Sequence, residues 1–216
     1  MGVGAGGSAG PRLRGARLLA VEGVRKMSRK FDPARAARLE SPERLALLPV
    51  EKALALVDVK AGELVLDVGC GVGVFTIPLA RAVGESGQVF AVDLRAEMVE
   101  ACRRRVSALG LSHVTVAQSG ENSIPLPLGS VDLVFACHLL HELEDPPAFL
   151  AEVRRVLRPA GRLAVIEWEK RETGAGPPVE HRVSSADSRV LLEESGFTVT
   201  DTRSVTWANY LLLARP

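Results

Sequence analysis

The stretch Leu64-Val-Leu-Asp-Val-Gly-Cys-Gly-Val-Gly-Val-Phe-Thr76 decides the fold of this chain. It opens with a short apolar run that carries Asp67 near its end, and three glycines follow at alternate positions, Gly69, Gly71 and Gly73. This order predicts a buried strand, a tight turn and the start of a helix. Glycine lets backbone approach a ligand closely, and a helix N-terminus offers free N–H groups to a polar or anionic group. The stretch therefore predicts either a ligand site or a tight strand–helix packing turn.

The spacing of these glycines differs from that of the dinucleotide fingerprint, which is G-x-G-x-x-G. Here the third glycine comes one residue early, and an acid stands just before the turn. The pattern Asp67-x-Gly69-x-Gly71-x-Gly73 resembles motif I of the class I methyltransferases that use S-adenosylmethionine. An NAD-dependent oxidoreductase is the alternative that the glycine spacing disfavours.

Length and composition set ordinary bounds on the class of protein. The chain has 216 residues, of which 47% are hydrophobic and 25% charged, as expected for one globular domain. Its net charge of +1 gives no overall positive electrostatic field that would favour binding of nucleic acid. No apolar run reaches the roughly 18 residues of a membrane span. The three cysteines, Cys70, Cys102 and Cys137, lack the spacing of a metal site, and without a secretory signal they favour a cytoplasmic protein with reduced thiols.

Composition divides the chain into three parts. Residues 1–30 are rich in glycine and then in arginine and lysine, with Glu22 as the single acid, and we interpret them as a flexible basic extension. Met27 is a candidate natural start, which makes the first 26 residues dispensable; a transit peptide is the alternative. Residues 31–62 are expected to form an N-terminal helical cap, and residues 63–216 the core domain. Within the cap, 49–59 has a helical period and is either a packing helix or a flap over the ligand.

The core alternates apolar strands with amphipathic helices. The expected strands are 64–68, 88–92, 113–117, 131–136, 162–167, 197–202 and 206–213. The expected helices are 74–83, 96–109, 145–157 and 186–194. Such alternation favours parallel pairing with right-handed crossovers, whereas the short gap between the last two strands favours an antiparallel hairpin. We therefore predict an α/β fold: a doubly wound, mostly parallel seven-stranded sheet with helices on both faces and an antiparallel strand near the C-terminus, similar to the methyltransferase fold.

In an open sheet of this kind the ligand lies beyond the carboxyl ends of the strands, near the switch point between the first and fourth strands. Asp93 follows the second strand, 20 residues after Gly73, where a carboxylate can accept both ribose hydroxyls. Its alternative role is to cap the following helix. The family resemblance also implies an acid after the third strand that accepts from the adenine amino group. That position is Gly120 here, so either the neighbouring Glu121 or a backbone carbonyl makes the contact.

The expected cofactor-binding residues are Asp67, Gly69, Cys70, Gly71, Gly73, Asp93, Leu94, Glu121, Asn122 and Cys137. Two histidines, His138 and His141, follow the fourth strand and share a face if helical. Each is a candidate general base, because an imidazole titrates near neutrality, or else a structural histidine. Further ligands at suitable spacing are missing, so we expect no metal site.

From Phe31 to about Gly196 the chain resembles an uncharacterised bacterial and archaeal branch near the ubiquinone/menaquinone methyltransferases. The matching pieces are Lys30-Phe-Asp-Pro33, Ser41-Pro-Glu-Arg44, Asp67 to Gly73, Ala91-Val-Asp93, Glu121-Asn122, Ile124-Pro-Leu-Pro127, His141-Glu142, Val165-Ile-Glu-Trp168 and Gly176-Pro-Pro178. The resemblance implies S-adenosyl-L-methionine as cofactor and direct in-line methyl transfer. It names neither the acceptor nor the atom methylated. A non-catalytic S-adenosylmethionine-binding subunit or regulator is the alternative.

The acceptor is expected to be a small molecule. The Asn-Pro-Pro-aromatic run of amino-group methylators and the paired cysteines of arsenic methylators are absent, and no appended basic domain favours nucleic acid. Phe31, the His138–Glu142 loop and the long segment 169–184 are candidate walls of the acceptor pocket. Because the last is unusually long, we interpret it as a lid or, alternatively, a solvated linker.

Overall fold

The computed structural model describes Met1 and residues 30–216, so the predictions made for residues 1–26 lie outside the described part, apart from Met1 itself. The strands are β1 Leu64–Val68, β2 Gln88–Asp93, β3 Val114–Gln118, β4 Val131–Cys137, β5 Leu157–Trp168, β6 Thr198–Ser204 and β7 Asn209–Arg215. The α-helices are α1 Pro42–Leu47, α2 Val50–Val57, α3 Thr76–Val83, α4 Ala96–Ala108, α5 Pro146–Val156 and α6 Ser185–Glu194. Three short 3₁₀ helices are η1 Pro33–Glu40, η2 Leu140–Glu142 and η3 Val179–His181.

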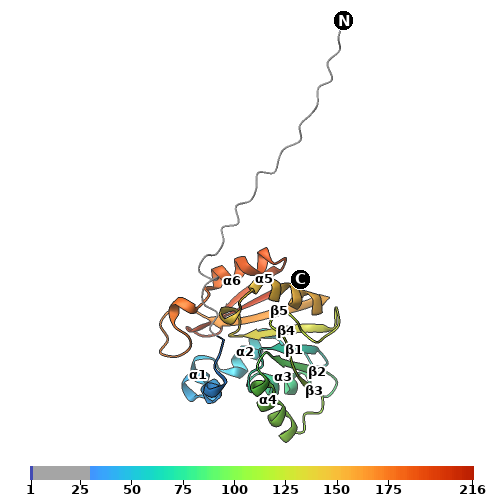
Figure 1. The fold of residues 1–216 in the computed structure, drawn as a ribbon, viewed down its shortest axis with the longest axis vertical. Helices are drawn as coiled ribbons and strands as arrows, with labels where there is room; N and C mark the ends of the chain where they lie inside the picture. The colour runs from blue at the N-terminus through green and yellow to red at the C-terminus, as the bar shows by residue number, and fades with distance from the viewer. Residues whose placement is uncertain (2–29) are drawn as a thin grey trace.

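The strands form one sheet in the order β3-β2-β1-β4-β5-β7-β6. Strands β1 to β5 pair in parallel, and β7 runs antiparallel to both β5 and β6 (Figure 1). The predicted fold class is therefore confirmed, including the antiparallel strand near the C-terminus. The order reverses between β1 and β4, so these two strands flank the switch point at which such sheets bind ligands.

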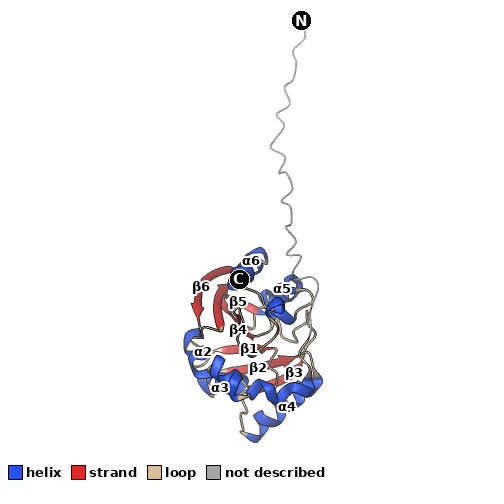
Figure 2. Ribbon diagram, turned by 90° about the vertical axis from the view of Figure 1, so that its left-hand side faces the viewer, coloured by secondary structure: helices blue, strands red, loops and turns tan. Residues whose placement is uncertain are grey.

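Helices cover both faces of the sheet, as Figure 2 shows. On one face α2 and α3 pack against alternate residues of the central strands, such as Val65, Leu133 and Ile166. On the other face α5 and the buried Leu192 of α6 pack against the intervening residues, such as Leu66 and Val134. These alternations follow the period of two in a strand, and they explain why the central strands read as continuous apolar runs.

Among the boundaries that differ from the sequence predictions, three have a local cause. β5 begins at Leu157 rather than at residue 162, because residues 158–161 form a bulge in β5 opposite the β4 residues Val131 and Leu133. The segment 72–75 forms turns, so α3 begins at Thr76. The last strand begins at Asn209, because the amides of two preceding residues, 205 and 206, both donate to the Asn209 carbonyl to close the hairpin.

Of the N-terminal elements, α2 packs into the hydrophobic core, and α1 precedes it in the chain. Val50, Ala53 and Val57 of α2 are buried in the core, which agrees with the interpretation of this segment as a packing helix. Ser41 caps α1 by accepting from the Arg44 amide, with Pro42 at the first helical position. In the described part of the chain no helix is long and apolar enough to span a membrane.

Candidate active site

The glycine turn after β1 is tied to β2 and leaves bare backbone facing outward. The amides of Gly69 and Cys70 both donate to the Val92 carbonyl, at 2.8 and 3.0 Å. Gly69 has a φ of 73° and Gly71 a φ of 54°. This is the left-handed region, which residues with a Cβ adopt only with backbone strain. A Cβ on Gly69 would lie 3.0 Å from Leu139 Cδ1, so glycine keeps the space between this backbone and the Leu139 side chain open.

Gly73 has a packing role rather than a lining role. Its φ is 87°, and a Cβ there would lie 3.0 Å from Cys102 Sγ on α4. Asp67 lies beneath the turn, only 2% exposed, and its carboxylate accepts from the Thr76 hydroxyl at 2.6 Å. Burial, with a further contribution from Asp93, raises the pKa of Asp67 to about 7 despite this hydrogen bond.

Asp93 lies at the end of β2 and is partly buried. Its Oδ2 accepts from the Gly71 amide and its Oδ1 from the Arg95 amide, both at 2.9 Å. A carboxylate offers about four lone-pair positions, so both oxygens retain acceptor capacity for a ligand. Asp93 is not the N-cap residue of α4, because that residue is Arg95, whose side chain makes no capping hydrogen bond.

A cavity of about 900 Å³ runs from the glycine turn across the ends of β1, β2, β4 and β5. Its floor includes the turn and the residues after β4, and the segment 30–44 and the loop 174–181 complete its wall. Both histidines and most of the predicted cofactor-binding residues line it: Asp67, Gly69, Cys70, Gly71, Asp93, Leu94, Glu121 and Cys137. Gly73 and the exposed Asn122 are not among the lining residues.

Glu121 is already engaged by the protein. Its Oε1 accepts from the amides of Glu144 and Asp145 at 2.7 and 3.1 Å, and its Oε2 pairs with the Lys30 ammonium. Lys30 also reaches Glu144 at 3.2 Å. The Glu121 carboxylate thus joins the start of the described chain to the loop before α5, and its predicted contact with adenine remains a prediction.

The His138 ring is fixed by a stacking contact and by hydrogen bonds at both of its nitrogens. Its φ is 56°, its ring stacks on Trp168 with centroids 4.3 Å apart, and its Nε2 donates to Asn209 Oδ1 at 2.6 Å. Its Nδ1 faces Arg44 Nη2 at 3.3 Å and accepts from that donor. Burial and the Arg44 charge lower the pKa of His138 to about 3. A neutral ring with both nitrogens engaged suits a structural role better than that of a general base.

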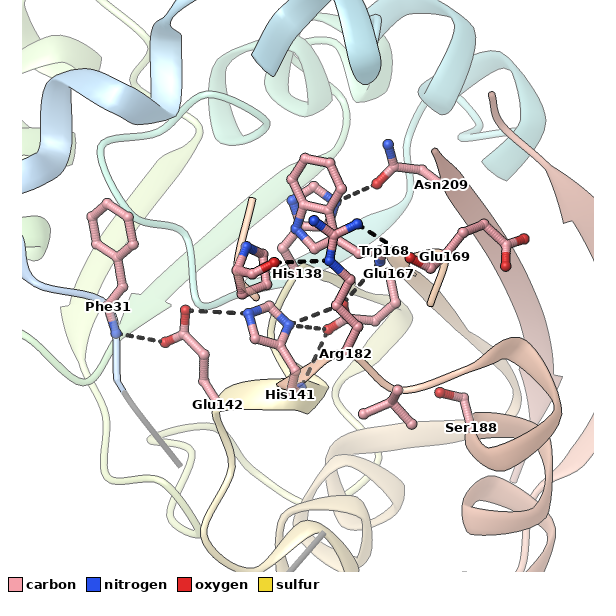
Figure 3. Close-up of polar contacts among 12 residues, drawn as sticks. Phe31, His138, His141, Glu142, Glu167, Trp168, Glu169, Arg182, Ser188 and Asn209 are labelled. Carbon is pink, nitrogen blue, oxygen red and sulfur yellow. Dashed lines mark hydrogen bonds and ion pairs between the residues drawn. The ribbon is translucent and has the colours of Figure 1, made fainter. Parts of the chain in front are cut away.

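His141 has the opposite environment. Its Nδ1 lies 3.0 Å from both carboxylate oxygens of Glu167, which is completely buried at the end of β5 (Figure 3). Burial alone would lower the pKa of His141, but the charge of Glu167, its hydrogen bond to the ring and the charge of Glu142 together outweigh burial, and the pKa is raised. Burial likewise works to raise the pKa of Glu167, and the nearby His141 outweighs it, so that pKa is lowered. The pair fixes Nδ1 as the protonated nitrogen and leaves Nε2 as the acceptor when the ring is neutral.

Glu142 lies on the other side of His141. Figure 3 shows His141 between Glu142 and Glu167. Glu142 Oε1 is 3.8 Å from His141 Nε2, and its Oε2 accepts from the Phe31 amide at 2.9 Å. Burial raises the pKa of Glu142. Through this contact the N-terminal segment reaches the histidine that sequence reasoning placed in the acceptor pocket.

The loop after β5 is fixed by a buried arginine that the sequence analysis did not identify. Arg182 is 4% exposed and donates to four carbonyls and to the Thr173 hydroxyl, at 2.7 to 3.2 Å. The acceptor carbonyls belong to Glu169, Arg171, Ala175 and Pro177. The guanidinium also lies 5.0 Å from the Trp168 ring. Segment 169–184 is thus an ordered wall of the cavity rather than a solvated linker.

Sequence reasoning also missed the role of Glu167. The available signal was a single acid inside an apolar strand, since an unpaired carboxylate is rarely fully buried. Within residues 30–216 no group of histidine, cysteine and acidic side chains is arranged to hold a metal ion.

Comparison with known proteins identifies the family. Residues 66–165 match a family model described as a methyltransferase domain. A crystal structure of a SAM-dependent methyltransferase from Aquifex aeolicus is similar over 86% of this chain and 98% of that chain, with a TM-score of 0.82 and 40% identity. The chain belongs to the S-adenosylmethionine-dependent methyltransferases.

Two curated relatives of this methyltransferase match over shorter stretches. An uncharacterised 37.1 kDa protein in transposon TN4556 of Streptomyces fradiae is 43% identical over 47% of this chain and 29% of its own length. A demethylmenaquinone methyltransferase of Anoxybacillus flavithermus is 34% identical over 45% of this chain and 41% of its own length. The methyltransferase chain thus matches less than half the length of either relative.

The residues of the cavity fit S-adenosylmethionine. A Cβ at Gly69 or Gly71 would occupy space that glycine leaves open beside the backbone. This backbone lies next to the Asp93 carboxylate, which retains free lone pairs. A hydroxylated sugar needs such an acceptor, and a nucleoside needs close backbone. The glycine turn and Asp93 lie at the ends of β1 and β2, and His138 and His141 follow β4 in the same cavity.

Proposed function

We propose that this chain transfers a methyl group from S-adenosylmethionine to a small-molecule acceptor, with His141 as the general base. The observation that carries the proposal is that His141, which lines the same cavity as the glycine turn, is paired with the buried Glu167 carboxylate behind it. A carboxylate that orients an imidazole is the arrangement that activates a base in many enzymes. Here it occurs within one cavity with the backbone that fits the cofactor.

The cofactor end of the proposal rests on the strand ends. Asp93 accepts the ribose hydroxyls, and the backbone from Gly69 to Gly71 lies against the rest of the cofactor, with Asp67, Cys70 and Leu94 beside it. Cys137, at the end of β4, lies between this region and the histidines. For the adenine contact we retain Glu121, whose Oε2 has one lone pair left beside Lys30. Asn122 would need a side-chain movement to take part.

When bound, S-adenosylmethionine supplies a methyl group on a positively charged sulfur that already acts as a good leaving group. The side chains therefore need to align the acceptor, exclude water and remove a proton where the acceptor carries one. The segment 30–44 and the loop held by Arg182 enclose the cavity. His141 Nε2 receives the acceptor proton, and Glu167 stabilises the imidazolium that results.

This arrangement favours an acceptor that is a weak acid in its resting state, such as a phenol or quinol. The relative from Anoxybacillus flavithermus is named a demethylmenaquinone methyltransferase, which gives a quinol a place in the first set of acceptors to try. Phe31 and Leu139 provide apolar surface in the same wall. A thiol or an amine that arrives already deprotonated would not need His141.

Two measurements test the proposal. The first is binding of S-adenosylmethionine and S-adenosylhomocysteine by isothermal titration calorimetry. The second is formation of S-adenosylhomocysteine with a panel of quinols, phenols, thiols and amines. We expect micromolar or tighter binding and turnover with a weakly acidic acceptor. Tight binding without product across the panel would favour the alternative, a non-catalytic S-adenosylmethionine-binding subunit or regulator. Absence of binding would reject both.

A further inference from the structure

Among the residues that the structure describes, Arg44 is a cation of the cavity wall without an acidic partner. Arg44 lies in α1 and is partly buried. Its Nη1 donates to the Leu39 carbonyl at 2.7 Å and its Nη2 to His138 Nδ1 at 3.3 Å. In the described part of the chain no carboxylate lies within ion-pair distance of its guanidinium. Burial lowers the pKa of Arg44.

The other cations that line the cavity have different surroundings. Lys30 is paired with Glu121 and Glu144, and the remaining three are exposed: Arg35, Arg38 and Arg95. Within the described residues, Arg44 is thus the partly buried cation of this wall that lacks a countercharge. A guanidinium has five N–H donors, and two hydrogen bonds leave part of its fork available.

Removing a charge from water is costly unless an opposite charge compensates for it. A planar guanidinium that is charged at every physiological pH suits a carboxylate, which it can bind through two parallel hydrogen bonds. The ligand supplies the missing charge if it carries such a group.

We propose that Arg44 binds a carboxylate in this cavity, carried either by the amino-acid end of the cofactor or by the methyl acceptor. The inference rests on the proposed function for the identity of these two sources. Arg44 contacts His138, which directly follows β4 and lies three residues before His141. Arg44, the glycine turn and His141 line the same cavity, so a carboxylate from either molecule can reach the Arg44 guanidinium.

The first experiment compares two ligands that differ only in the carboxylate. S-adenosylhomocysteine carries it, and S-adenosyl-3-thiopropylamine lacks it. Their affinities are measured by calorimetry for the full chain and for Arg44→Gln and Arg44→Lys. If the cofactor supplies the carboxylate, Arg44→Gln weakens S-adenosylhomocysteine by about 10- to 100-fold and leaves S-adenosyl-3-thiopropylamine nearly unchanged. Arg44→Lys retains the charge but loses the fork, so its effect lies between the two.

The second experiment asks the same question of the acceptor end. With S-adenosylhomocysteine bound, benzoate and benzyl alcohol are titrated into the wild type and into Arg44→Gln. If the acceptor supplies the carboxylate, the wild type prefers benzoate, and the variant loses that preference. Arg104→Gln is the control, because Arg104 is exposed on α4, lies outside the cavity wall and changes the net charge by the same amount.

The comparison within each pair separates binding from folding. A variant that only loosens α1 weakens both members of a pair equally, and this result would overturn the proposal. It would also be overturned if Arg44→Gln changed the preference in neither pair. Loss of preference in the first pair assigns the carboxylate to the cofactor, and loss in the second assigns it to the acceptor. Failure of the wild type to bind either adenosyl compound would reject the proposed function itself, so the two failures are distinguishable.

Discussion

His138 and His141 lie three residues apart in the chain, yet their imidazoles have opposite electrostatic environments. His138 faces the Arg44 guanidinium, which together with burial lowers its pKa to about 3. His141 faces the Glu167 carboxylate, which raises its pKa in spite of burial. Both residues are histidines in the segment that follows β4, so the difference between their pKa values comes entirely from the groups that the fold places beside each ring.

At the residue scale, we predict that the pH dependence of methyl transfer reports on His141. A base must be neutral to accept a proton, so kcat/KM rises with pH through the raised pKa of His141, above its ordinary 6.5. Glu167→Gln removes the carboxylate and shifts this rise to lower pH. His141→Asn lowers the rate by about 100-fold or more. The measurement is a pH–rate profile with the acceptor identified by the panel.

Glu172→Gln is the control for this profile, because Glu172 is exposed in the loop after β5. An unchanged profile in Glu167→Gln would mean that His141 does not set the titration. Retention of full activity in His141→Asn would show that the acceptor is already deprotonated when it binds.

We also predict that Asp93→Ala weakens S-adenosylhomocysteine binding by about 10- to 100-fold, because hydrogen bonds to a charged acceptor are worth more than neutral ones. The Asp93 carboxylate also accepts from the Gly71 amide, so Asp93→Asn, which keeps an acceptor oxygen, loses less. Calorimetry gives the affinity, with Glu97→Ala, an exposed acid in the first turn of α4, as the control. Unchanged affinity in Asp93→Ala would reject the ribose role.

At the scale of elements, the segment from Glu169 to Ser184 shows how one side chain orders a loop of polar and small residues. Arg182 donates to backbone carbonyls of the loop, which have no partner in a helix or strand. Its guanidinium also lies over the Trp168 ring. Gly176 comes so close to that indole that a Cβ would lie 2.8 Å from Trp168 Cε2. Buried carbonyls need donors, and this requirement determines the path of the loop.

We predict that Arg182→Ala lowers the free energy of unfolding by roughly 3 kcal/mol, because it leaves several carbonyls without donors. It also raises the rate of proteolysis within 169–184. Urea unfolding and limited trypsin or thermolysin digestion measure the two effects. Arg171→Ala is the matched control, since the Arg171 side chain is exposed in the same loop. Equal stability of the two variants would mean that the loop is held by other contacts.

At the scale of the whole molecule, the segment 30–44 crosses from the start of the described chain to the carboxyl ends of the strands (Figure 1). Lys30 pairs with Glu121, the Phe31 amide donates to Glu142, and Arg44 reaches His138. These contacts join positions about 90 to 110 residues apart in the chain. They make the N-terminal segment part of the cavity wall.

We therefore predict a sharp boundary for N-terminal truncation. Deletion of residues 2–26 is expected to leave the thermal midpoint and the affinity for S-adenosylhomocysteine unchanged, because that stretch is rich in glycine and poor in acids. Deletion of residues 2–30 removes the Lys30 ion pairs with Glu121 and Glu144 and weakens binding, by an amount that decreases with added salt. A lower midpoint after the shorter deletion would show that the extension packs on the domain.

Several properties of this protein follow from the order of residues alone. Strand-sized apolar runs that alternate with amphipathic helices specify the doubly wound sheet, because each strand can bury its faces only against the helices beside it in the chain. Asp67, the glycines and Asp93 follow β1 and β2, so local sequence also placed them at one edge of the sheet. The bulge in β5 escaped prediction, because a Pro-Ala-Gly run is compatible with both a turn and an irregular strand.

Which charges meet depends on contacts between residues that are distant in the chain. Glu167 and His141 are 26 residues apart, and Arg44 and His138 are 94 apart, so no local pattern links the members of either pair. A pKa depends on the charges and the solvent within a few ångströms of the group, and those neighbours come from different strands and loops. The order of residues thus specifies the sheet and the glycine turn with its neighbouring carboxylate. Long-range packing specifies which histidine meets a carboxylate and which arginine of the described residues meets none.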